Sequence, residues 1–582
     1  MRLAFLLVLG LLITGCSAVH VRDRPVDDYL AARRGDVLTT GHLSASSRET
    51  LLTFGLDDRA CRKDARPCIA TLIGARELDE EGRLATIAEL HLSIALKTHA
   101  PDDYAQAARF SYAYLFFTAR DPGQRAFEDR QTQVRDFYSF ATEQLTSLMF
   151  NGVEYPKIQL GDIRLHLPHG QLTPRELIPA SHLEFDGVRN TYRRDGFGAA
   201  FVAVAAAPDS ASTSATLYES LFLSATVVLR FPGTTLEEVL TSPDARLDIY
   251  DPYRDSTAQL GARVVPLAAN FTAPYALWLS RSQFGREAGR ALFAGSAALT
   301  QPRIYAMQPY DPQRRTIVLI HGLASSPEGW VNLVNEIMGD EALRSRYQVW
   351  QVFYPTNLPI PENVRNIRLA LLDALCMRDP DGTAPASEHM TLIGHSMGGV
   401  IARLLVTDSP DGLWQTFFDH PIEAAQRERL AVLDPYLTLS PLPQVDRAIF
   451  LASPHRGSPM AHAWIGRAAA RLVHLPTSML QKLGSMADAL AAELPTQADV
   501  LRHRQLSSVA FLSDEDRYLR ATSTLPIAAD VTYHSIIGSN DEVVPYSSSH
   551  LEGAASEQRV RSGHSVQQTA AAILAIRTIL RD

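Results

Sequence analysis

Short apolar runs, most of them separated by segments of helix length, dominate the second half of the chain. The runs lie at residues 316–322, 347–354, 390–396, 447–453 and 532–538. Apolar runs of this length are typical of strands that are buried on both faces of a sheet. Strands that alternate with helices are joined by right-handed crossovers and form a parallel sheet. We predict a mostly parallel α/β domain over residues 301–582.

A second pattern, apolar residues at helical spacing, occupies about residues 77–150. Its apolar positions are Leu84, Ile87, Leu90, Ile94, Phe127, Val134, Phe137, Ala141, Leu145 and Leu148. Such spacing places an apolar stripe on each helix, and Asp121-Pro122-Gly123 marks a turn between the second and third helices. We predict two or three antiparallel helices in an N-terminal helical domain over residues 17–150.

A third pattern, short strands that end at turns, lies between these two regions. Residues 225–231 end at Pro232-Gly233, and residues 246–250 end at Asp251-Pro252. Apolar and β-branched runs bounded by such residues are typical of short strands. We predict a β-rich, sandwich-like domain over residues 151–300.

The first residues have the pattern of a secretory signal. Met1-Arg2 supplies a positive start, and the apolar run that follows is shorter than the roughly 20 residues that a helix needs to span a bilayer. Thr14-Gly15-Cys16 then resembles a bacterial lipobox, with Ser17 rather than aspartate after the cysteine. The resemblance implies that residues 1–16 are a lipoprotein signal peptide with its lipobox, and that a lipid on Cys16 anchors the protein in the bacterial cell envelope, at the outer membrane. An ordinary signal with a coincidental cysteine is the alternative.

The other cysteines and the net charge limit the remaining chemistry. Cys61 and Cys68 flank a charged loop, and an oxidising periplasm would permit a disulfide between them. Cys376 falls in an apolar helical run, which predicts a buried free thiol. The sequence has no zinc-like spacing of ligands, so we expect neither a metal nor another cofactor. The formal net charge of -9 argues against a nucleic-acid partner, because duplex binding depends on cationic side chains; protein partners are not identified.

One glycine-rich turn carries the strongest chemical signal. Gly394-His395-Ser396-Met397-Gly398 follows an apolar strand and opens a helix from Val400 to Thr407. In a nucleophile elbow the serine lies on a strained turn between strand and helix, and small residues two before and two after it let the backbones approach closely. Both positions, Gly394 and Gly398, are glycine here. We predict that Ser396 is a nucleophile; the alternative is a glycine-rich turn with an incidental serine.

A serine nucleophile needs a base and an orienting carboxylate, which this fold places in the chain order serine, acid, histidine. Asp541 follows the last apolar run on a loop, and its rivals are Glu542 and Asp530. His564 lies on a loop before a terminal helix. Its rival, His550, leaves little room after Asp541 for the intervening crossover. We predict Ser396, Asp541 and His564 as the catalytic residues.

Backbone amides are the expected donors to the oxyanion that develops in acyl transfer. One is the amide of Met397, the residue after the nucleophile. His321-Gly322 resembles the oxyanion loop of lipases, which implies the amide of Leu323 as the second donor. The histidine at 321 is expected to pin this loop rather than to react. His455 is likewise expected to fix its own loop.

From about residue 459 to 529 the strand pattern stops. Helical segments rich in alanine and leucine lie at 461–472, 479–494 and 498–506. An insertion at this point looks like a helical cap over Ser396, which would exclude water and present apolar surface to acyl chains. A helical elaboration that never moves is an equal alternative.

Residues 310–582 resemble the lipase-like branch of the α/β-hydrolases. The resemblance rests on the elbow at Ser396, the His321-Gly322 loop, Pro454-His455-Arg456-Gly457-Ser458, Asp541-Glu542-Val543-Val544-Pro545 and the terminal His564. It implies a serine esterase or lipase that hydrolyses an acyl ester or lipid through a Ser-His-Asp triad and an acyl-enzyme. The same triad would serve a peptidase or an acyltransferase, and a catalytically inactive envelope scaffold is a further alternative. Lys482 is the only lysine after residue 157, which argues against a serine-lysine dyad.

Overall fold

The computed structural model describes most of the chain. The described residues are 34–75, 79–150, 163–166, 174–205, 216–282, 284–288, 301–409, 411–417, 422–459, 475, 477–491 and 511–582. They divide into two compact units, one drawn from Met1–His166, Val227–Asp248 and Gln259–Val265, the other from Leu167–Thr226, Ile249–Ala258 and Pro266–Asp582. None of the helices in the described part combines the length and apolarity that crossing a bilayer demands. Cys16 and the predicted cap segments 461–472 and 498–506 lie outside the described residues.

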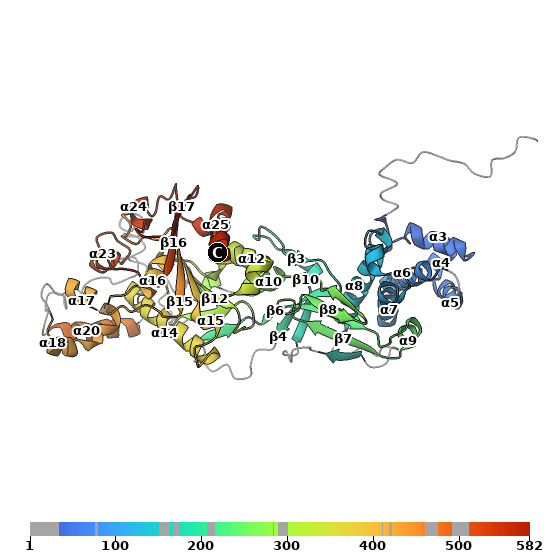
Figure 1. Cartoon of the computed structure of the whole chain (residues 1–582), viewed down its shortest axis with the longest axis horizontal. Coiled ribbons are helices and arrows are strands. Elements are labelled where there is room, and N and C mark those ends of the chain that lie inside the picture. The colour runs from blue at the N-terminus through green and yellow to red at the C-terminus, as the bar shows by residue number, and fades with distance from the viewer. Residues whose placement is uncertain are drawn as a thin grey trace, which may run out of the picture. The chain divides into compact units, whose positions relative to one another are not determined.

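The first unit is built mainly from helices (Figure 1). They are α3 (Ala45–Thr53), α4 (Asp58–Lys63), α5 (Arg66–Gly74), α6 (Glu80–Thr98), α7 (Pro101–Phe117), η1 (Pro122–Arg125), α8 (Asp129–Phe150) and α9 (Leu236–Thr241). Helix α6 ends at Thr98 and is capped by His99, which has a left-handed φ of 53°. Helix α7 begins two residues after His99 at Pro101, whose fixed φ suits the first helical position. Helices α6, α7 and α8 pack against one another. The predicted helical part is confirmed.

Most of the predicted apolar stripe faces the interior, but two of its positions do not. Leu84, Ile87 and Leu90 are fully buried on α6. Phe127 is 100% exposed, because it precedes the first residue of α8 and helical spacing does not govern its direction. Leu148, in the last turns of α8, is 36% exposed. These two residues therefore do not continue the buried stripe of their helix.

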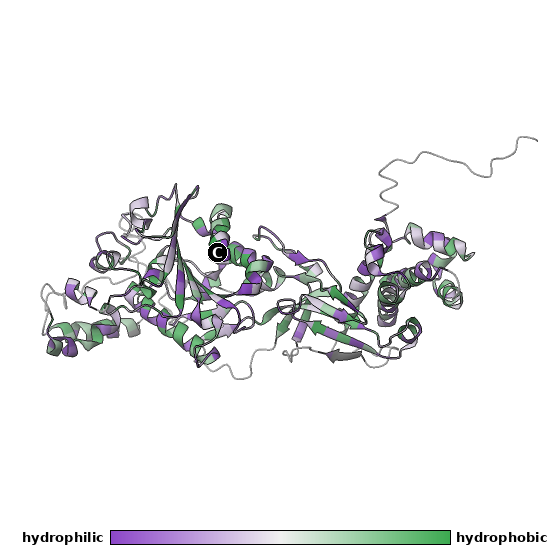
Figure 2. Ribbon diagram, viewed as in Figure 1, coloured by the Kyte–Doolittle hydropathy of each residue, from purple (hydrophilic) through white to green (hydrophobic). Residues whose placement is uncertain are grey.

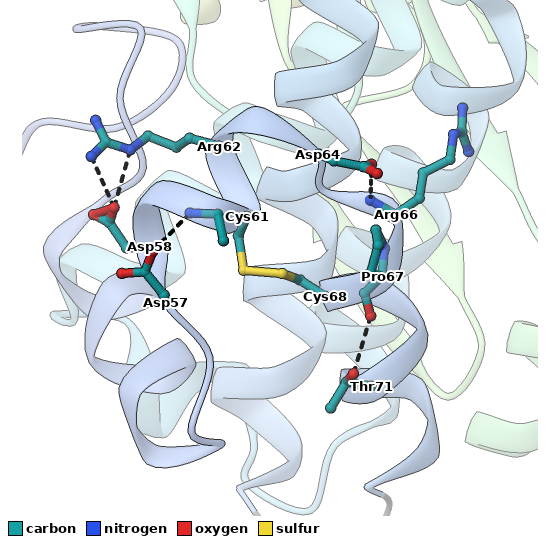
Figure 3. The surroundings of a disulfide bond; sticks show 10 residues. Asp57, Asp58, Cys61, Arg62, Asp64, Arg66, Pro67, Cys68 and Thr71 are labelled. Carbon is teal, nitrogen blue, oxygen red and sulfur yellow. Dashed lines mark hydrogen bonds and ion pairs between the residues drawn. A yellow bond between two sulfur atoms is a disulfide. The ribbon is translucent and has the colours of Figure 1, made fainter.

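A disulfide joins Cys61 on α4 to Cys68 on α5 (Figure 3). Their Cα atoms are 5.8 Å apart, and both side chains are buried. The neighbouring Arg62 forms an ion pair with Asp58 on the same helix. Helices of six and nine residues have little stability in isolation, so the covalent bond fixes one against the other.

The predicted β-rich region is also present. Its strands are β1 (Ile163–His166), β2 (Pro174–Pro179), β3 (Arg193–Arg194), β4 (Ala199–Ala205), β6 (Phe222–Arg230), β7 (Ala245–Tyr250), β8 (Thr257–Leu260), β9 (Arg263–Pro266) and β10 (Ala269–Asn270). Five of them form one sheet in the order β1-β7-β6-β4-β2, and the others form the ribbons β10-β3 and β8-β9. In the described residues this arrangement is simpler than the sandwich that we predicted. Two short helices, η2 (Ala180–His182) and α10 (Ala273–Arg281), accompany the sheet.

The second unit contains an eight-stranded sheet in the order β17-β16-β15-β14-β12-β13-β11-β5. Its strands are β5 (Leu217–Glu219), β11 (Arg303–Ala306), β12 (Arg315–Ile320), β13 (Tyr347–Phe353), β14 (Met390–His395), β15 (Val445–Leu451), β16 (Thr532–Gly538) and β17 (Ser556–Val560). Strands β12 to β17 all run parallel to one another, whereas β11 is antiparallel to its neighbour β13. All five predicted strands are present, and the mostly parallel α/β sheet is confirmed.

Helices cover both faces of this sheet. They are η3 (Pro327–Trp330), α12 (Val331–Gly339), α13 (Glu341–Arg346), α14 (Ile360–Arg378), α15 (Pro385–Glu388), α16 (Met397–Leu405), α17 (Gly412–Phe417), α18 (Ala424–Arg429), η4 (Ala431–Leu433), α19 (Asp434–Leu437), α20 (Thr477–Ala491), α23 (Arg517–Ser523), α24 (Tyr546–Ser549), η6 (Val566–Gln568) and α25 (Ala570–Arg581). Ile317 and Leu319 of β12 join the core under α12 and α25, whereas Val318 and Ile320 join the core under α14 and α16. This alternation is that of a strand buried on both sides, and apolar residues are prominent on α16 and α25 in Figure 2.

Cys376 is a free cysteine on α14, but it is exposed rather than buried. Ile367, Leu371 and Leu375 form the buried stripe of this helix at intervals of four residues. Cys376 comes one residue after that stripe, and one residue turns the side chain by about 100° around the helix. The helix predicted from this apolar run is present, but the prediction that Cys376 lies on its buried face was wrong.

Candidate functional site

Ser396 lies on the turn between β14 and α16, in a backbone conformation that a non-glycine residue rarely adopts. Its φ and ψ angles are 54° and -125°, and the residue is only 8% exposed. A Cβ atom on Gly394 would lie 2.4 Å from the carbonyl oxygen of Gly398, and one on Gly398 would lie 2.1 Å from that of Ile320. The turn therefore needs glycine at both flanking positions, as the sequence pattern predicts.

A chain of two hydrogen bonds leads from the Ser396 hydroxyl to a carboxylate. Nε2 of His564 lies 2.9 Å from Oγ of Ser396, and Nδ1 of the same ring lies 2.9 Å from Oδ2 of Asp541. An ionised carboxylate only accepts hydrogen bonds, so Nδ1 carries the proton and Nε2 is free to accept one from the hydroxyl. The structure thus brings together three residues that lie far apart in the chain and that we predicted to form one site.

The carboxylate of Asp541 is placed by the loop after β16. Its side chain is 1% exposed, and its Oδ1 atom accepts hydrogen bonds from the amides of Val543 (2.8 Å) and Val544 (2.9 Å). Burial alone would raise the pKa of this carboxyl, but the hydrogen bond from His564 and the two amides outweigh burial and hold the pKa below its usual range. Asp541 is therefore ionised at neutral pH and fixes the imidazole in one tautomer.

The loop after β12 lies against the elbow. A Cβ atom on Gly322 would be 3.0 Å from Cβ of Ser396, so the backbone of this loop passes directly beside the hydroxyl-bearing residue. Among the described residues, the amides of Leu323 and Met397 donate no hydrogen bond. Two free amides beside one hydroxyl are what an oxyanion site requires.

Sequence reasoning did not identify the group that holds this loop. The hydroxyl of Tyr354, directly after β13, donates to the carbonyl of His321 over 2.7 Å, and the two rings stack with centroids 4.6 Å apart. Nδ1 of His321 also contacts the carbonyl of Gly322 at 3.0 Å, and burial lowers the pKa of His321 to about 4. His321 is thus a neutral residue within the loop, and nothing in the local pattern marks Tyr354 as its partner.

The rival residues lie outside this group. Glu542 and Asp530 are exposed, and within the described residues neither forms a hydrogen bond or an ion pair with an imidazole of the site. His550 instead pairs with Glu557, at 2.7 Å from Nδ1 to Oε2. His455 is buried against the ring of Phe450 and makes no contact with the serine hydroxyl.

Comparison with known protein families identifies the fold of this region. Residues 317–576 match the model of a family described as the Alpha/beta hydrolase family. The C-terminal region has the α/β-hydrolase fold. We refer to residues 301–582 as the hydrolase region. A search of curated proteins found no match.

Similar solved structures include three bacterial or environmental enzymes. A Bacillus licheniformis lipase in its mature form is 15% identical, with 48% of this chain and 97% of that chain covered and a TM-score of 0.27. The Burkholderia xenovorans enol-lactonase is 16% identical, with 49% and 98% covered and a TM-score of 0.26. An epoxide hydrolase from metagenomes of hot environments is 15% identical, with 48% and 94% covered and a TM-score of 0.24. At these low scores and identities the likenesses carry no argument about substrate.

Proposed function

We propose that this protein is a serine hydrolase that cleaves acyl esters, with Ser396 as nucleophile, His564 as general base and Asp541 as the orienting acid. The observation that supports the proposal is the continuous pair of 2.9 Å hydrogen bonds from hydroxyl to imidazole to carboxylate. A nucleophile within reach of a base, with the base oriented by a third group, is the arrangement that activates serine. The matching family consists mostly of hydrolases.

The geometry permits acyl transfer in two steps. As Oγ of Ser396 attacks the ester carbonyl, its proton passes to Nε2 of His564, and the resulting imidazolium is stabilised by the buried Asp541. The amides of Leu323 and Met397 donate to the oxyanion. The imidazolium then protonates the departing alkoxide, which leaves an acyl ester on Ser396. Water, deprotonated by the same imidazole, releases the carboxylic acid and restores the serine.

Replacing the nucleophile tests the proposal directly. We expect Ser396→Ala to lose measurable hydrolysis of a short p-nitrophenyl ester and labelling by a fluorophosphonate probe, because both require the activated hydroxyl. Ser535→Ala is a matched control, because Ser535 is equally buried but its hydroxyl donates to the carbonyl of Ser549. Full activity of Ser396→Ala would overturn the proposal. A wild type that neither labels with the probe nor turns over the ester would point to the scaffold alternative.

Acyl acceptor and bond type separate the remaining alternatives. We propose water as the acceptor and an ester as the bond, because residues 310–582 resemble the lipase-like branch of the α/β-hydrolases at the elbow, the acid loop and the terminal histidine. Adding a primary alcohol at increasing concentration should leave free acid as the main product. Dominant transesterification would favour an acyltransferase, and faster cleavage of a matched anilide than of the ester would favour a peptidase.

We also propose that a lipid on Cys16 anchors the protein in the cell envelope, at the outer membrane. The support is the sequence Thr14-Gly15-Cys16-Ser17 after a short apolar run. Cys16→Ala should move the protein from the membrane fraction to the soluble fraction of a bacterial host and prevent incorporation of labelled palmitate. Unchanged fractionation of the variant would contradict the anchor.

A further inference from the structure

The imidazole of His395 lies between the nucleophile strand and the loop that carries the base. His395 is the last residue of β14 and is 7% exposed. Its Nε2 atom is 2.9 Å from the backbone carbonyl oxygen of His564, and the centroids of the two rings are 5.0 Å apart. A carbonyl oxygen only accepts, so Nε2 of His395 carries a proton and donates it.

Within the described residues, few other hydrogen bonds hold the backbone of this loop at His564. His564 lies between β17 and η6, and its carbonyl also accepts from the amide of Val566 at 2.8 Å, a bond within the same loop. Farther back, the amide of Asn540 donates to the carbonyl of Ser562 at 3.0 Å. His395 therefore ties the backbone of the base to the strand that ends at the nucleophile.

The charge state of His395 suits this contact. Burial and, to a lesser extent, the neighbouring His564 lower its pKa to about 3. The ring is neutral at neutral pH and donates a hydrogen bond without a charge. A cation at this point would repel the imidazolium that forms on His564 during acyl transfer, whereas a neutral donor does not.

We propose that His395 is a positioning residue: its hydrogen bond to the His564 backbone keeps Nε2 of the base within reach of the Ser396 hydroxyl. The inference rests on the proposed function, because it assigns His395 a part in the same proton transfer. A displacement of about 1 Å between reacting groups can cost on the order of 10²-fold in rate. The contact therefore acts on rate rather than on substrate binding.

Two substitutions separate the hydrogen bond from the bulk of the ring. His395→Leu keeps an apolar side chain but removes the donor, and we expect kcat to fall about 10- to 100-fold with KM nearly unchanged. His395→Gln retains an amide donor at similar reach and should recover most of the rate. His455→Leu is the matched control, because His455 is an equally buried histidine whose ring nitrogens have no hydrogen-bond partner among the described residues.

Labelling by a fluorophosphonate probe distinguishes positioning from folding. The final extent of labelling reports the fraction of folded sites, and the rate of labelling reports how well the base serves the hydroxyl. We expect His395→Leu to label to the full extent but slowly, His395→Gln to label at nearly the wild-type rate, and His455→Leu to match the wild type. A wild-type rate for His395→Leu, an equally slow His395→Gln, or a loss confined to the extent of labelling would overturn the inference. Failure of the proposed function would instead show as full activity of Ser396→Ala.

Discussion

Two buried carboxylates in different regions of the molecule differ in the partners that they hold. Glu89 on α6 is fully buried in the helical unit. Its Oε1 atom accepts from the amides of Val37 (3.1 Å) and Ser44 (2.8 Å), and its Oε2 atom accepts from the hydroxyls of Ser44 (2.7 Å) and Ser47 (2.5 Å). Arg130 adds an ion pair at 3.4 Å. Each of these partners keeps its proton at any ordinary pH, so the cluster is purely structural.

Asp541 in the hydrolase region is buried to a similar degree, and it is also saturated with hydrogen bonds. One of its partners, however, is the imidazole of His564, which can gain a proton and whose other nitrogen faces the hydroxyl of Ser396. Burial and full hydrogen bonding are common to both acids. The two acids differ because one partner of Asp541, His564, can gain a proton and also contacts the nucleophile Ser396.

The largest expected effect follows from changing the acid at 541 to its amide. In Asp541→Asn the Oδ1 atom can still accept from Val543 and Val544, but the amide nitrogen faces Nδ1 and forces the imidazole into the wrong tautomer. In a triad of this kind such a change lowers kcat by about 10⁴-fold. We expect a fall of about 10³- to 10⁴-fold in ester hydrolysis with little change in stability, measured by p-nitrophenyl ester turnover and thermal unfolding.

Glu542→Gln supplies the control for this comparison, since Glu542 is adjacent in sequence but exposed. It should leave kcat within about twofold of the wild type, because surface substitutions of this kind have small effects. Equal losses in the two variants would mean that the loop as a whole, rather than the carboxylate at 541, is what matters.

The second expected effect is on stability rather than on rate. Glu89→Ala leaves the two serine hydroxyls and two amides without their acceptor and removes the ion pair with Arg130, which costs about 3–5 kcal/mol in the helical unit. All five tryptophans lie after residue 277, within the second unit, so their fluorescence reports on that unit. We expect the helical transition in circular dichroism to shift to lower urea, while tryptophan fluorescence and esterase activity stay unchanged.

The exposed Glu49 on α3 offers the matched substitution. Glu49→Ala should leave both transitions in place. If Glu89→Ala instead shifted tryptophan fluorescence or abolished activity, the two units would not be energetically separate and the contrast between the two acids would fail.

The sequence reveals the nucleophile and the sheet more readily than the contacts around them. Central strands such as β12 and β14 are buried on both faces, so their composition marks them. The edge strands β5 and β17 are short and partly exposed, with little apolar content, and were not predicted. Phe127 is apolar but lies just outside helix α8 and is exposed, and composition alone does not distinguish such a residue from a buried one inside the helix.

Within the candidate site, too, residues with a local sequence signal were predicted more readily than contacts between distant residues. Ser396 was found because its glycines and the strand before it are local in sequence. Asp541 was chosen over its rivals because its loop resembles the acid loop of α/β-hydrolases, and His564 was chosen over His550 by loop length, which is weaker information. The bond from His395 to the carbonyl of His564 joins residues 169 positions apart and leaves no local signal, although His395 was already recognised as part of the elbow. Contacts between side chain and distant backbone need the folded structure.

A smaller effect is expected from pH. His395 has a pKa of about 3 in the folded protein against an ordinary value of 6.5, so below pH 6.5 the unfolded chain takes up a proton that the folded chain does not. Its contribution to stability is complete above pH 6.5 and is lost as the pH falls toward 3. We expect about 3 kcal/mol of the loss between pH 7.5 and 4.5 to come from this residue, at about 1.4 kcal/mol for each pKa unit.

Urea unfolding followed by tryptophan fluorescence at the two pH values measures this contribution. His395→Gln cannot titrate, so its stability should fall by about 3 kcal/mol less than that of the wild type over the same interval. Identical pH dependence in His395→Gln and the wild type would show that the ring at 395 is not held neutral by burial.

The smallest effect returns to the helical unit and to the disulfide between Cys61 and Cys68. The bond closes a loop with a sequence separation of only 7, so the loop entropy that it removes from the unfolded chain is modest, about 2 kcal/mol. Cys61→Ala/Cys68→Ala should therefore shift the circular dichroism transition less than Glu89→Ala does, with tryptophan fluorescence unmoved. A larger shift than that of Glu89→Ala would mean that α4 and α5 depend on the covalent bond more than the unit depends on its buried acid, because helices this short have little stability of their own.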